Sequence, residues 1–304
     1  MAPSTQCAAV PDGLDDITAA AIAIPGMSSW AALKDRAKFV AGETVLVNGA
    51  TGTAGRLAVQ IAKYLGAKKV IATGRNAVAL QSLKALGADL TILLVENYVA
   101  LEDAFKEQFV GGVDVVLDYL WGQSAERLLI AGGKAGKDTP TRFIQIGTAS
   151  GANITLPGAI LRSSAIELMG SGLGSVPLDR ILRAIEKLLQ AVVPGRFEIA
   201  TKPVPLSEVE QAWSCADASG HAVAEPAIAL INSRRRIAFP KAQDCARLNL
   251  QDPITAGIYA WRNSGQEPSN AKIFGRSCRL RVNRDWVPSV ASSSLSAAPK
   301  ATRR

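Results

Sequence analysis

Residues 45–55 read Val45-Leu-Val-Asn-Gly-Ala-Thr-Gly-Thr-Ala-Gly55, and this stretch decides the expected fold. A short apolar run, typical of a buried strand, leads into a glycine-rich turn, and an amphipathic segment with helical spacing follows. Within it, Ala50-x-Gly52-x-x-Gly55 fits the dinucleotide-binding fingerprint, with alanine in place of the first glycine. Strand, turn and helix in this order predict the first unit of a parallel α/β sheet.

The glycines of this turn would have separate physical tasks in a nucleotide site. The backbone at Gly52 has to approach a pyrophosphate closely, and Gly55 lets the helix pack closely against the strand. The N–H groups at the start of the helix then meet the phosphates in the favourable direction of the helix dipole. An ordinary tight turn between a strand and a helix has similar glycines, so the wider sequence has to favour one interpretation.

The wider sequence is a series of short, nearly continuous apolar runs, which are typical of parallel strands covered on both faces. Helix-like segments alternate with these runs, and Gly66 stands where the first helix is expected to end. This context favours the dinucleotide site. The fold class predicted is α/β, a doubly wound parallel Rossmann sheet of about six strands, at Thr44–Asn48, Lys69–Thr73, Leu90–Leu94, Val113–Asp118, Arg142–Ile146 and Ile166–Met169.

The chain divides into four predicted parts: a helical lead-in at 1–43, a cofactor domain at 44–170, C-terminal helices at 171–220, and an atypical tail at 221–304. In the lead-in we expect two short helices, the first capped by Asp15 or Asp16, with Pro25-Gly26 separating them. The tail is predicted to be mostly disordered, because regular periodicity is hard to find in its sequence.

The formal net charge of +8 is concentrated in the tail. Residues 1–221 carry 20 Lys and Arg against 21 Asp and Glu, whereas residues 222–304 carry 14 against 5. A basic segment suggests a nucleic-acid or membrane contact, but few aromatic residues are interleaved with these charges, so we expect neither partner. Binding to nucleic acid or to a membrane through the tail is therefore kept only as a minor alternative function.

Cysteine and histidine usage excludes other classes. The four cysteines lie far apart, and His221 is the only histidine, which argues against a disulfide framework and against a His-rich zinc site. No apolar run reaches the roughly 18 residues of a membrane span, and no secretory leader is recognisable. We therefore expect a cytoplasmic protein without a metal.

The residues after the second predicted strand indicate the type of dinucleotide. NAD sites usually place an acidic residue about 20 positions after the glycines, where it accepts from the ribose 2′-OH. Here Gly74, Arg75 and Asn76 stand in that region, and a guanidinium suits a 2′-phosphate, which a carboxylate would repel. NADP(H) is therefore the expected cofactor. The alternative is that Arg75 is only a solvated loop residue.

Further candidates stand at the ends of later strands, where ligands bind in open α/β sheets. Asp118 ends the fourth strand, and Gly147 with Thr148 follows the fifth. Asp118 either contacts the cofactor or caps the helix that begins near Gln123, and the sequence does not decide between them. Trp121 is interpreted as part of the core or of a pocket wall.

Three separated motifs carry a family resemblance: VLVNGATGTAGRLAVQIAKYLGAKKVIATGRN, DVVLDYLWG and FIQIGTASG. Together they resemble the cofactor domain of zinc-free medium-chain dehydrogenases/reductases, with the quinone oxidoreductase-like branch nearest. The resemblance implies hydride transfer from NADPH to a quinone, an enone or a related small-molecule substrate, and it names no catalytic residue. It implies a pyrophosphate site at Gly49, Gly52, Thr53 and Ala54, a 2′-phosphate site at Gly74 and Arg75, and a nicotinamide side at Asp118, Ile146 and Gly147.

The chain departs from the family pattern at both ends. Family members carry a long GroES-like β domain before the motif that starts here near Val10, and only about ten residues stand in its place, so most of that domain is expected to be lacking. Residues 221–233 interrupt the usual family ending at Arg234–Phe239. A retained intron or a faulty gene model would produce such an interruption. The main alternative function is therefore an inactive remnant that binds the nucleotide without turnover. An atypical short-chain or epimerase-like enzyme is a further alternative, and a homodimer stays open.

Overall fold

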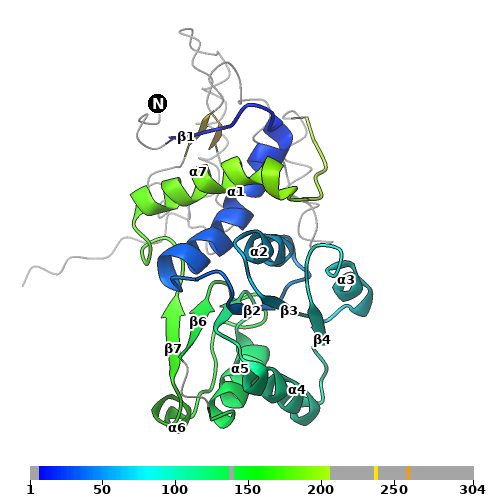
Figure 1. Cartoon of the computed structure of the whole chain (residues 1–304), viewed down its shortest axis with the longest axis vertical. Helices are drawn as coiled ribbons and strands as arrows, with labels where there is room; N and C mark the ends of the chain where they lie inside the picture. Colours follow the sequence, from blue (N-terminus) through cyan, green and yellow to red (C-terminus); the bar gives the residue numbers. More distant parts are fainter. Residues whose placement is uncertain (1–6, 137–139, 206–235, 239–258, 261–304) are drawn as a thin grey trace, which may run out of the picture. The chain divides into compact units, whose positions relative to one another are not determined.

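The computed structural model describes residues 7–136 and 140–205, together with two short strands at 236–238 and 259–260 (Figure 1). All of them lie in the first of two compact units, residues 1–263. The segments 206–235, 239–258 and 261–304 are outside the described residues. The last part of the predicted C-terminal helices at 171–220, the interruption at 221–233 and most of the predicted disordered tail therefore fall there.

A six-stranded parallel sheet forms the centre of the described unit. Its strand order is β4-β3-β2-β5-β6-β7, so the order reverses between β2 and β5, as in a doubly wound nucleotide-binding sheet. The predicted fold class is confirmed, and every predicted strand is present. The strands are β2 (Thr44–Asn48), β3 (Lys69–Gly74), β4 (Leu90–Leu93), β5 (Val115–Asp118), β6 (Thr141–Gln145) and β7 (Ile166–Gly170).

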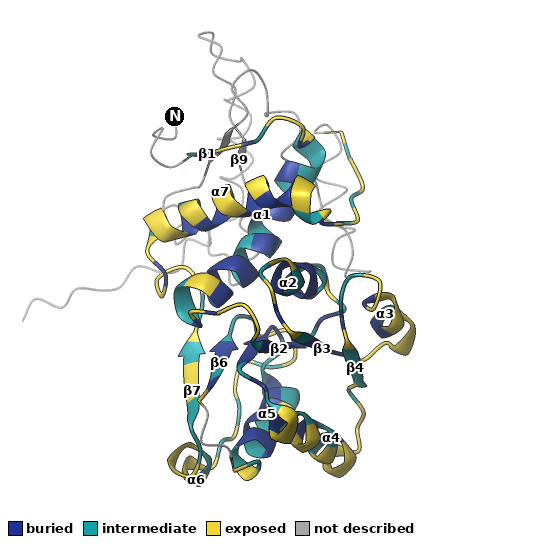
Figure 2. Cartoon of the chain, viewed as in Figure 1, coloured by how far each residue is buried: buried dark blue, intermediate teal, exposed yellow. Residues whose placement is uncertain are grey.

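Helices cover both faces of this sheet, which explains why its central strands β2, β3 and β5 are buried almost throughout (Figures 1 and 2). In β2, Val45 and Val47 face one core and Leu46 faces the other. The first core includes α2 and α7, and the second includes α4 and α5. The helices after β2 are α2 (Thr53–Tyr64), α3 (Ala77–Ser82), α4 (Tyr98–Gly111), α5 (Gly122–Lys134), α6 (Gly158–Arg162) and α7 (Leu178–Gly195).

The lead-in differs from the prediction of two helices. It forms one helix, α1 (Asp16–Ala31), which contains Pro25 and continues into the π-helical turn η2 (Ala32–Arg36). Asp15 is the N-cap and accepts from the backbone N–H of Thr18 at 2.9 Å. A Cβ on Gly26 would lie 2.7 Å from a methyl carbon of Leu188 in α7, so Gly26 allows close helix packing and does not end the helix.

A second sheet joins parts of the chain that are distant in sequence. Its strand order is β1-β8-β9, with β1 (Cys7–Ala9), β8 (Arg236–Ala238) and β9 (Tyr259–Ala260), and both pairings are antiparallel. Strands β8 and β9 lie within the segment predicted as a mostly disordered tail. Five residues of that segment therefore pair in a sheet, which a tail predicted as mostly disordered allows. Their pairing partners are far away in the sequence, so local periodicity gives little sign of them.

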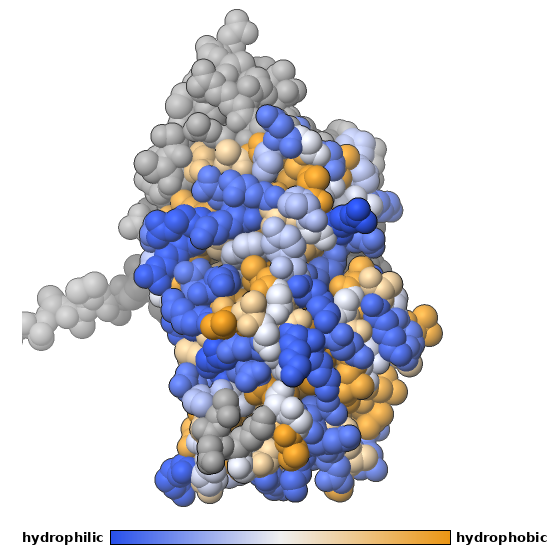
Figure 3. All heavy atoms as spheres, viewed as in Figure 1, coloured by the Kyte–Doolittle hydropathy of each residue, from blue (hydrophilic) through white to orange (hydrophobic). Residues whose placement is uncertain are grey.

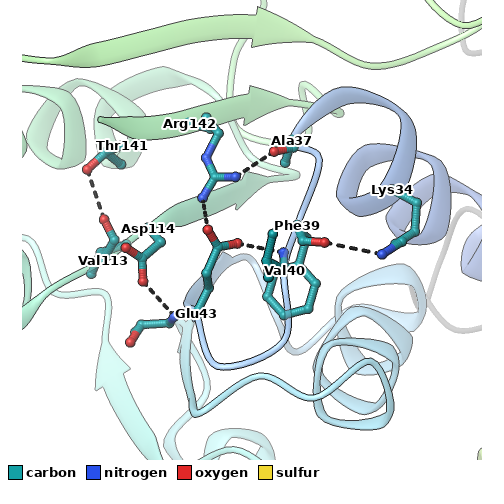
Figure 4. A network of polar contacts seen from close by, with 10 residues as sticks. Lys34, Ala37, Phe39, Val40, Glu43, Val113, Asp114, Thr141 and Arg142 are labelled. Carbon is teal, nitrogen blue, oxygen red and sulfur yellow. Dashed lines mark hydrogen bonds and ion pairs between the residues drawn. The ribbon is translucent and has the colours of Figure 1, made fainter. Parts of the chain in front are cut away.

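A polar network holds the amino ends of the strands (Figure 4). The guanidinium of Arg142 in β6 pairs with the carboxylate of Glu43 at 2.6 Å and donates to the carbonyl of Ala37 at 2.6 Å. The second carboxylate oxygen of Glu43 accepts from the backbone N–H of Val40 at 2.9 Å. The network thus attaches the segment after η2 to the sheet, at the end opposite the glycine-rich turn.

Replacing Arg142 by methionine is expected to lower the free energy of unfolding by about 1–3 kcal/mol, because it leaves the partly buried carboxylate of Glu43 without its cation. The side chains of this pair are 17% and 23% exposed. The matched control is Arg183→Met, which breaks the exposed pair of Arg183 with Asp179 and should cost less than about 0.5 kcal/mol. Urea unfolding of both variants measures the difference. Equal losses of unfolding free energy in the two variants would show that the Arg142 network stabilises the fold no more than the exposed pair does.

The surface of the described unit is largely hydrophilic on the face shown in Figure 3. Apolar side chains gather on the side of α3 and β4, where Val78, Leu93 and Val95 are exposed. Among the described residues, no helix is both long enough and apolar enough to cross a membrane.

Candidate functional site

The glycine-rich turn lies directly after β2, beside the point where the strand order reverses. Gly49 has φ of +88°, a conformation that glycine adopts readily, and an added Cβ would lie 2.8 Å from the side chain of Leu120. Its N–H donates to the hydroxyl of Thr73 at 3.1 Å, and the next N–H, of Ala50, donates to the carbonyl of Thr73 at 2.8 Å. Gly49 therefore shapes the turn, with its own amide already bonded within the protein.

Gly52 and Gly55 have opposite surroundings. A Cβ on Gly55 would lie 2.3 Å from the carbonyl oxygen of Gly49 and 2.6 Å from Cα of Ala50, so only glycine lets α2 approach the turn this closely. A Cβ on the exposed Gly52 would meet only one atom, 4.0 Å away. The protein therefore leaves open space at Gly52, as a backbone that receives a ligand requires.

Helix α2 begins at Thr53 without a side-chain cap. Its N-cap is Gly52, in extended conformation, and the first turn contains no acidic residue. The side chains of Thr53 and Ala54 are only half-buried. This helix end keeps the positive end of its dipole unneutralised by the chain, so it favours an anion.

The end of β3 lies against the same turn. A Cβ on the buried Gly74 would lie 2.5 Å from a side-chain carbon of Thr51, so glycine is needed where strand and turn touch. Arg75 follows directly and is exposed, and its side chain makes no hydrogen bond or ion pair with the described part of the chain. The sequence-predicted pyrophosphate and 2′-phosphate residues are therefore neighbours in the structure.

A buried polar cluster lies beneath the turn. The side-chain amide of Asn48, fully buried, donates to Oδ1 of Asp118 at 2.8 Å and to the hydroxyl of Ser124 at 2.9 Å. The hydroxyl of Thr73 donates to the amide oxygen of Asn48 at 2.7 Å. Sequence reasoning did not select Asn48 or Thr73, although two polar residues inside otherwise apolar strands are an available signal.

Asp118 itself is fully buried and is hydrogen-bonded to protein groups. Its carboxylate accepts from Asn48 and from the backbone N–H groups of Leu120, at 3.1 Å, and Trp121, at 3.2 Å. Both N–H groups precede α5, whose N-cap is Trp121, so the predicted capping role is wrong. Burial raises the pKa of Asp118 to about 6, and these hydrogen bonds oppose the increase.

Two loops at the carboxyl ends of β5 and β6 are joined by their backbones. The N–H groups of Ile146 and Gly147 donate to the carbonyl of Asp118 at 2.8 and 3.1 Å. A Cβ on Gly147 would lie 2.6 Å from the carbonyl oxygen of Tyr119. Gly147 is therefore a close-approach position that fixes the loop after β5, and Ile146 beside it is half-buried.

The raised pKa of Asp118 predicts a pH-dependent stability that an amide would lack. The folded chain binds this proton more tightly than the unfolded chain, so the contribution is fully present below about pH 4 and is lost as pH rises through about 6. Between pH 4 and pH 8, the unfolding free energy of the wild type should fall by roughly 2 kcal/mol relative to that of Asp118→Asn. Urea unfolding across this pH range tests it, and a constant difference would contradict it.

Comparison with known proteins agrees with this geometry. Residues 54–190 match the family model described as zinc-binding dehydrogenase. Over the described residues, however, no three His, Cys, Asp or Glu side chains are grouped so that they could hold a metal ion. The matched segment starts in the glycine-rich turn and ends in α7, so it covers the whole sheet beyond β2.

Among curated proteins, the probable NADPH-dependent quinone reductase tdiC of Emericella nidulans is 33% identical over 224 residues, which are 69% of this chain and 61% of tdiC. The 2-methylene-furan-3-one reductase of Solanum lycopersicum is 31% identical over 64% of this chain and 49% of its own length. Among solved structures, Escherichia coli quinone oxidoreductase complexed with NADPH is 25% identical, with a TM-score of 0.52, over 67% of this chain and 59% of that one.

The Rossmann sheet, the family match and these relatives agree on the fold of the medium-chain dehydrogenase/reductase class. These matches support a zinc-free quinone oxidoreductase-like protein of this superfamily. It spans less than two thirds of the length of the relatives named above.

Proposed function

We propose that the chain binds NADP(H) at the carboxyl ends of β2, β3 and β5 and transfers a hydride from NADPH to a quinone, an enone or a related carbonyl-activated small molecule. The observation that carries the proposal is the uncapped start of α2 behind Gly52, whose added Cβ would meet no protein atom closer than 4.0 Å. A pyrophosphate fits this combination of open space and free backbone donors.

In this proposal Gly52, Thr53 and Ala54 contact the pyrophosphate, and Gly49 gives the turn its shape. Gly74 brings the end of β3 next to the turn, and Arg75 pairs with the 2′-phosphate. Asp118, Ile146 and Gly147 lie on the nicotinamide side, where Asp118 acts through the loop that it holds. Its buried position and its bonds to protein donors support this indirect role.

Bound NADPH supplies the hydride, and the chain supplies orientation of the donor toward the acceptor. No side chain is assigned as an acid or base. The similarity to tdiC, a probable quinone reductase, and to the Solanum lycopersicum 2-methylene-furan-3-one reductase supports the choice of acceptor class.

Two measurements on the full chain separate the proposed enzyme from a protein that binds the nucleotide without turnover. Fluorescence titration with NADPH measures binding, and loss of NADPH absorbance with a panel of quinones and enones measures turnover. Saturable binding together with acceptor-dependent oxidation is the expected result. Binding without oxidation would support the inactive alternative, and absence of both would overturn the proposal.

A further inference from the structure

The buried polar cluster under the glycine-rich turn connects two regions that the proposed function uses separately. Its hydrogen bonds form a continuous chain that ends on the acceptor Asp118. The N–H of Gly49 donates to the hydroxyl of Thr73, this hydroxyl donates to Asn48, and the amide of Asn48 donates to Asp118. Asp118 then accepts from the backbone at Leu120 and Trp121.

The side chains of this chain of bonds come from three adjacent strands. Thr73 is in β3, Asn48 ends β2 and Asp118 ends β5, so the bonds cross the sheet where its strand order reverses. All three side chains are fully buried. Because water cannot replace a lost partner there, removing one member leaves its neighbours unpaired, and the connection is rigid.

The loop at the far end of these bonds is strained. Trp121 has φ of +57° and ψ of −156°, a combination that residues other than glycine rarely adopt. Such a conformation persists only where the surroundings impose it, and both carboxylate oxygens of Asp118 accept from the Trp121 N–H at 3.2 Å. The strained backbone of Trp121 and its hydrogen bonds to Asp118 are separate observations. Both indicate that this loop is held in one fixed conformation.

We propose that Thr73, Asn48 and Asp118 are positioning residues, a relay that holds the loop 119–121 in fixed register with the glycine-rich turn. The inference rests on the proposed function, because register between these regions matters when one dinucleotide spans both. The relay sets the distance between the pyrophosphate and the nicotinamide ends of the site, whereas Arg75 and the 2′-phosphate lie outside it.

The test compares two buried threonines at opposite ends of the strands of the sheet. Thr73→Val breaks the relay, whereas Thr141→Val removes a buried hydroxyl that donates to the carbonyl of Val113 at 2.9 Å, at the amino end of the sheet. Calorimetry measures the affinity of each variant for NADPH and for adenosine 2′-phosphate, which has no pyrophosphate. We expect Thr73→Val to weaken NADPH at least about tenfold and adenosine 2′-phosphate less than about twofold, with Thr141→Val changing neither.

Three further variants test whether the residues act in series. Asp118→Ala should weaken NADPH about as much as Thr73→Val, and the double variant should lose no more than either single variant. Asp118→Asn keeps an acceptor oxygen for Asn48 and should stay within about threefold of the wild type. Additive losses in the double variant, or an asparagine as harmful as alanine, would overturn the relay.

The outcomes distinguish the relay from the proposed function. If the wild type binds NADPH and Thr73→Val binds it equally well, the relay is wrong and the proposed function stands. If Thr73→Val weakens NADPH and adenosine 2′-phosphate to the same extent, the change is a general loosening and the relay is again wrong. If the wild type binds no NADPH, the proposed function fails, and the relay fails with it.

Discussion

Replacing Gly52 by valine is expected to weaken NADPH binding by at least about a hundredfold, or roughly 3 kcal/mol, while the chain stays folded. The φ of Gly52 is −74°, which valine tolerates, and an added Cβ meets only one protein atom, 4.0 Å away. The new side chain therefore occupies the space assigned to the pyrophosphate. Fluorescence titration with NADPH and a thermal melt measure binding and folding on the same sample.

Gly55→Ala is the matched contrast within the same turn. Its Cβ would lie 2.3 Å from the carbonyl oxygen of Gly49, so this smaller substitution should lower the free energy of unfolding by about 1–3 kcal/mol or more. Gly52 faces open space, so its substitution should weaken NADPH binding and leave the fold intact. Gly55 contacts backbone closely, so its substitution should destabilise the fold. Full NADPH affinity in a folded Gly52→Val protein would show that the pyrophosphate binds elsewhere.

Arg75→Glu is expected to weaken NADPH about tenfold to a hundredfold and to leave NADH unchanged or improved. The guanidinium is exposed and makes no hydrogen bond or ion pair with other described residues, so its replacement should disturb little except the 2′-phosphate. A glutamate repels that phosphate and accepts from a ribose 2′-OH. Parallel titrations with NADPH and NADH give the ratio of the two affinities.

Lys84→Glu supplies the control for net charge. Lys84 is also exposed, follows α3, and its substitution changes the charge of the molecule by the same amount. The ratio of NADPH to NADH affinity should move in Arg75→Glu and stay near the wild-type value in Lys84→Glu. An equal change in both variants would mean that Arg75 attracts the cofactor only through long-range charge.

The strands of the sheet could be predicted because burial on both faces leaves a strong local signal. β2 has the predicted bounds, and β3 extends the predicted run by one residue, to Gly74. The lead-in was predicted less well, since Pro25-Gly26 has the local character of a helix break. Packing of Gly26 against Leu188 of α7 decides the outcome there, and a contact 162 positions away in the sequence is not visible locally.

Some residues of the candidate site could likewise be predicted from the sequence, and others could not. Gly52, Gly55 and Arg75 could be selected from spacing, because one short turn imposes their order. The partners of Asn48 could not, since Thr73 and Asp118 stand 25 and 70 positions away and meet it only after the sheet has formed. For Asp118 the sequence offered cofactor contact or helix capping, whereas the structure gives it the backbone of the loop before α5.

The most direct test of the central claim, that the turn after β2 binds a nicotinamide dinucleotide phosphate, is a titration of the purified chain with NADPH followed by nicotinamide fluorescence. We expect a saturable signal with a dissociation constant in the micromolar range, competed by adenosine 2′-phosphate and strongly reduced in Gly52→Val. A signal that does not saturate up to about 1 mM NADPH would contradict it.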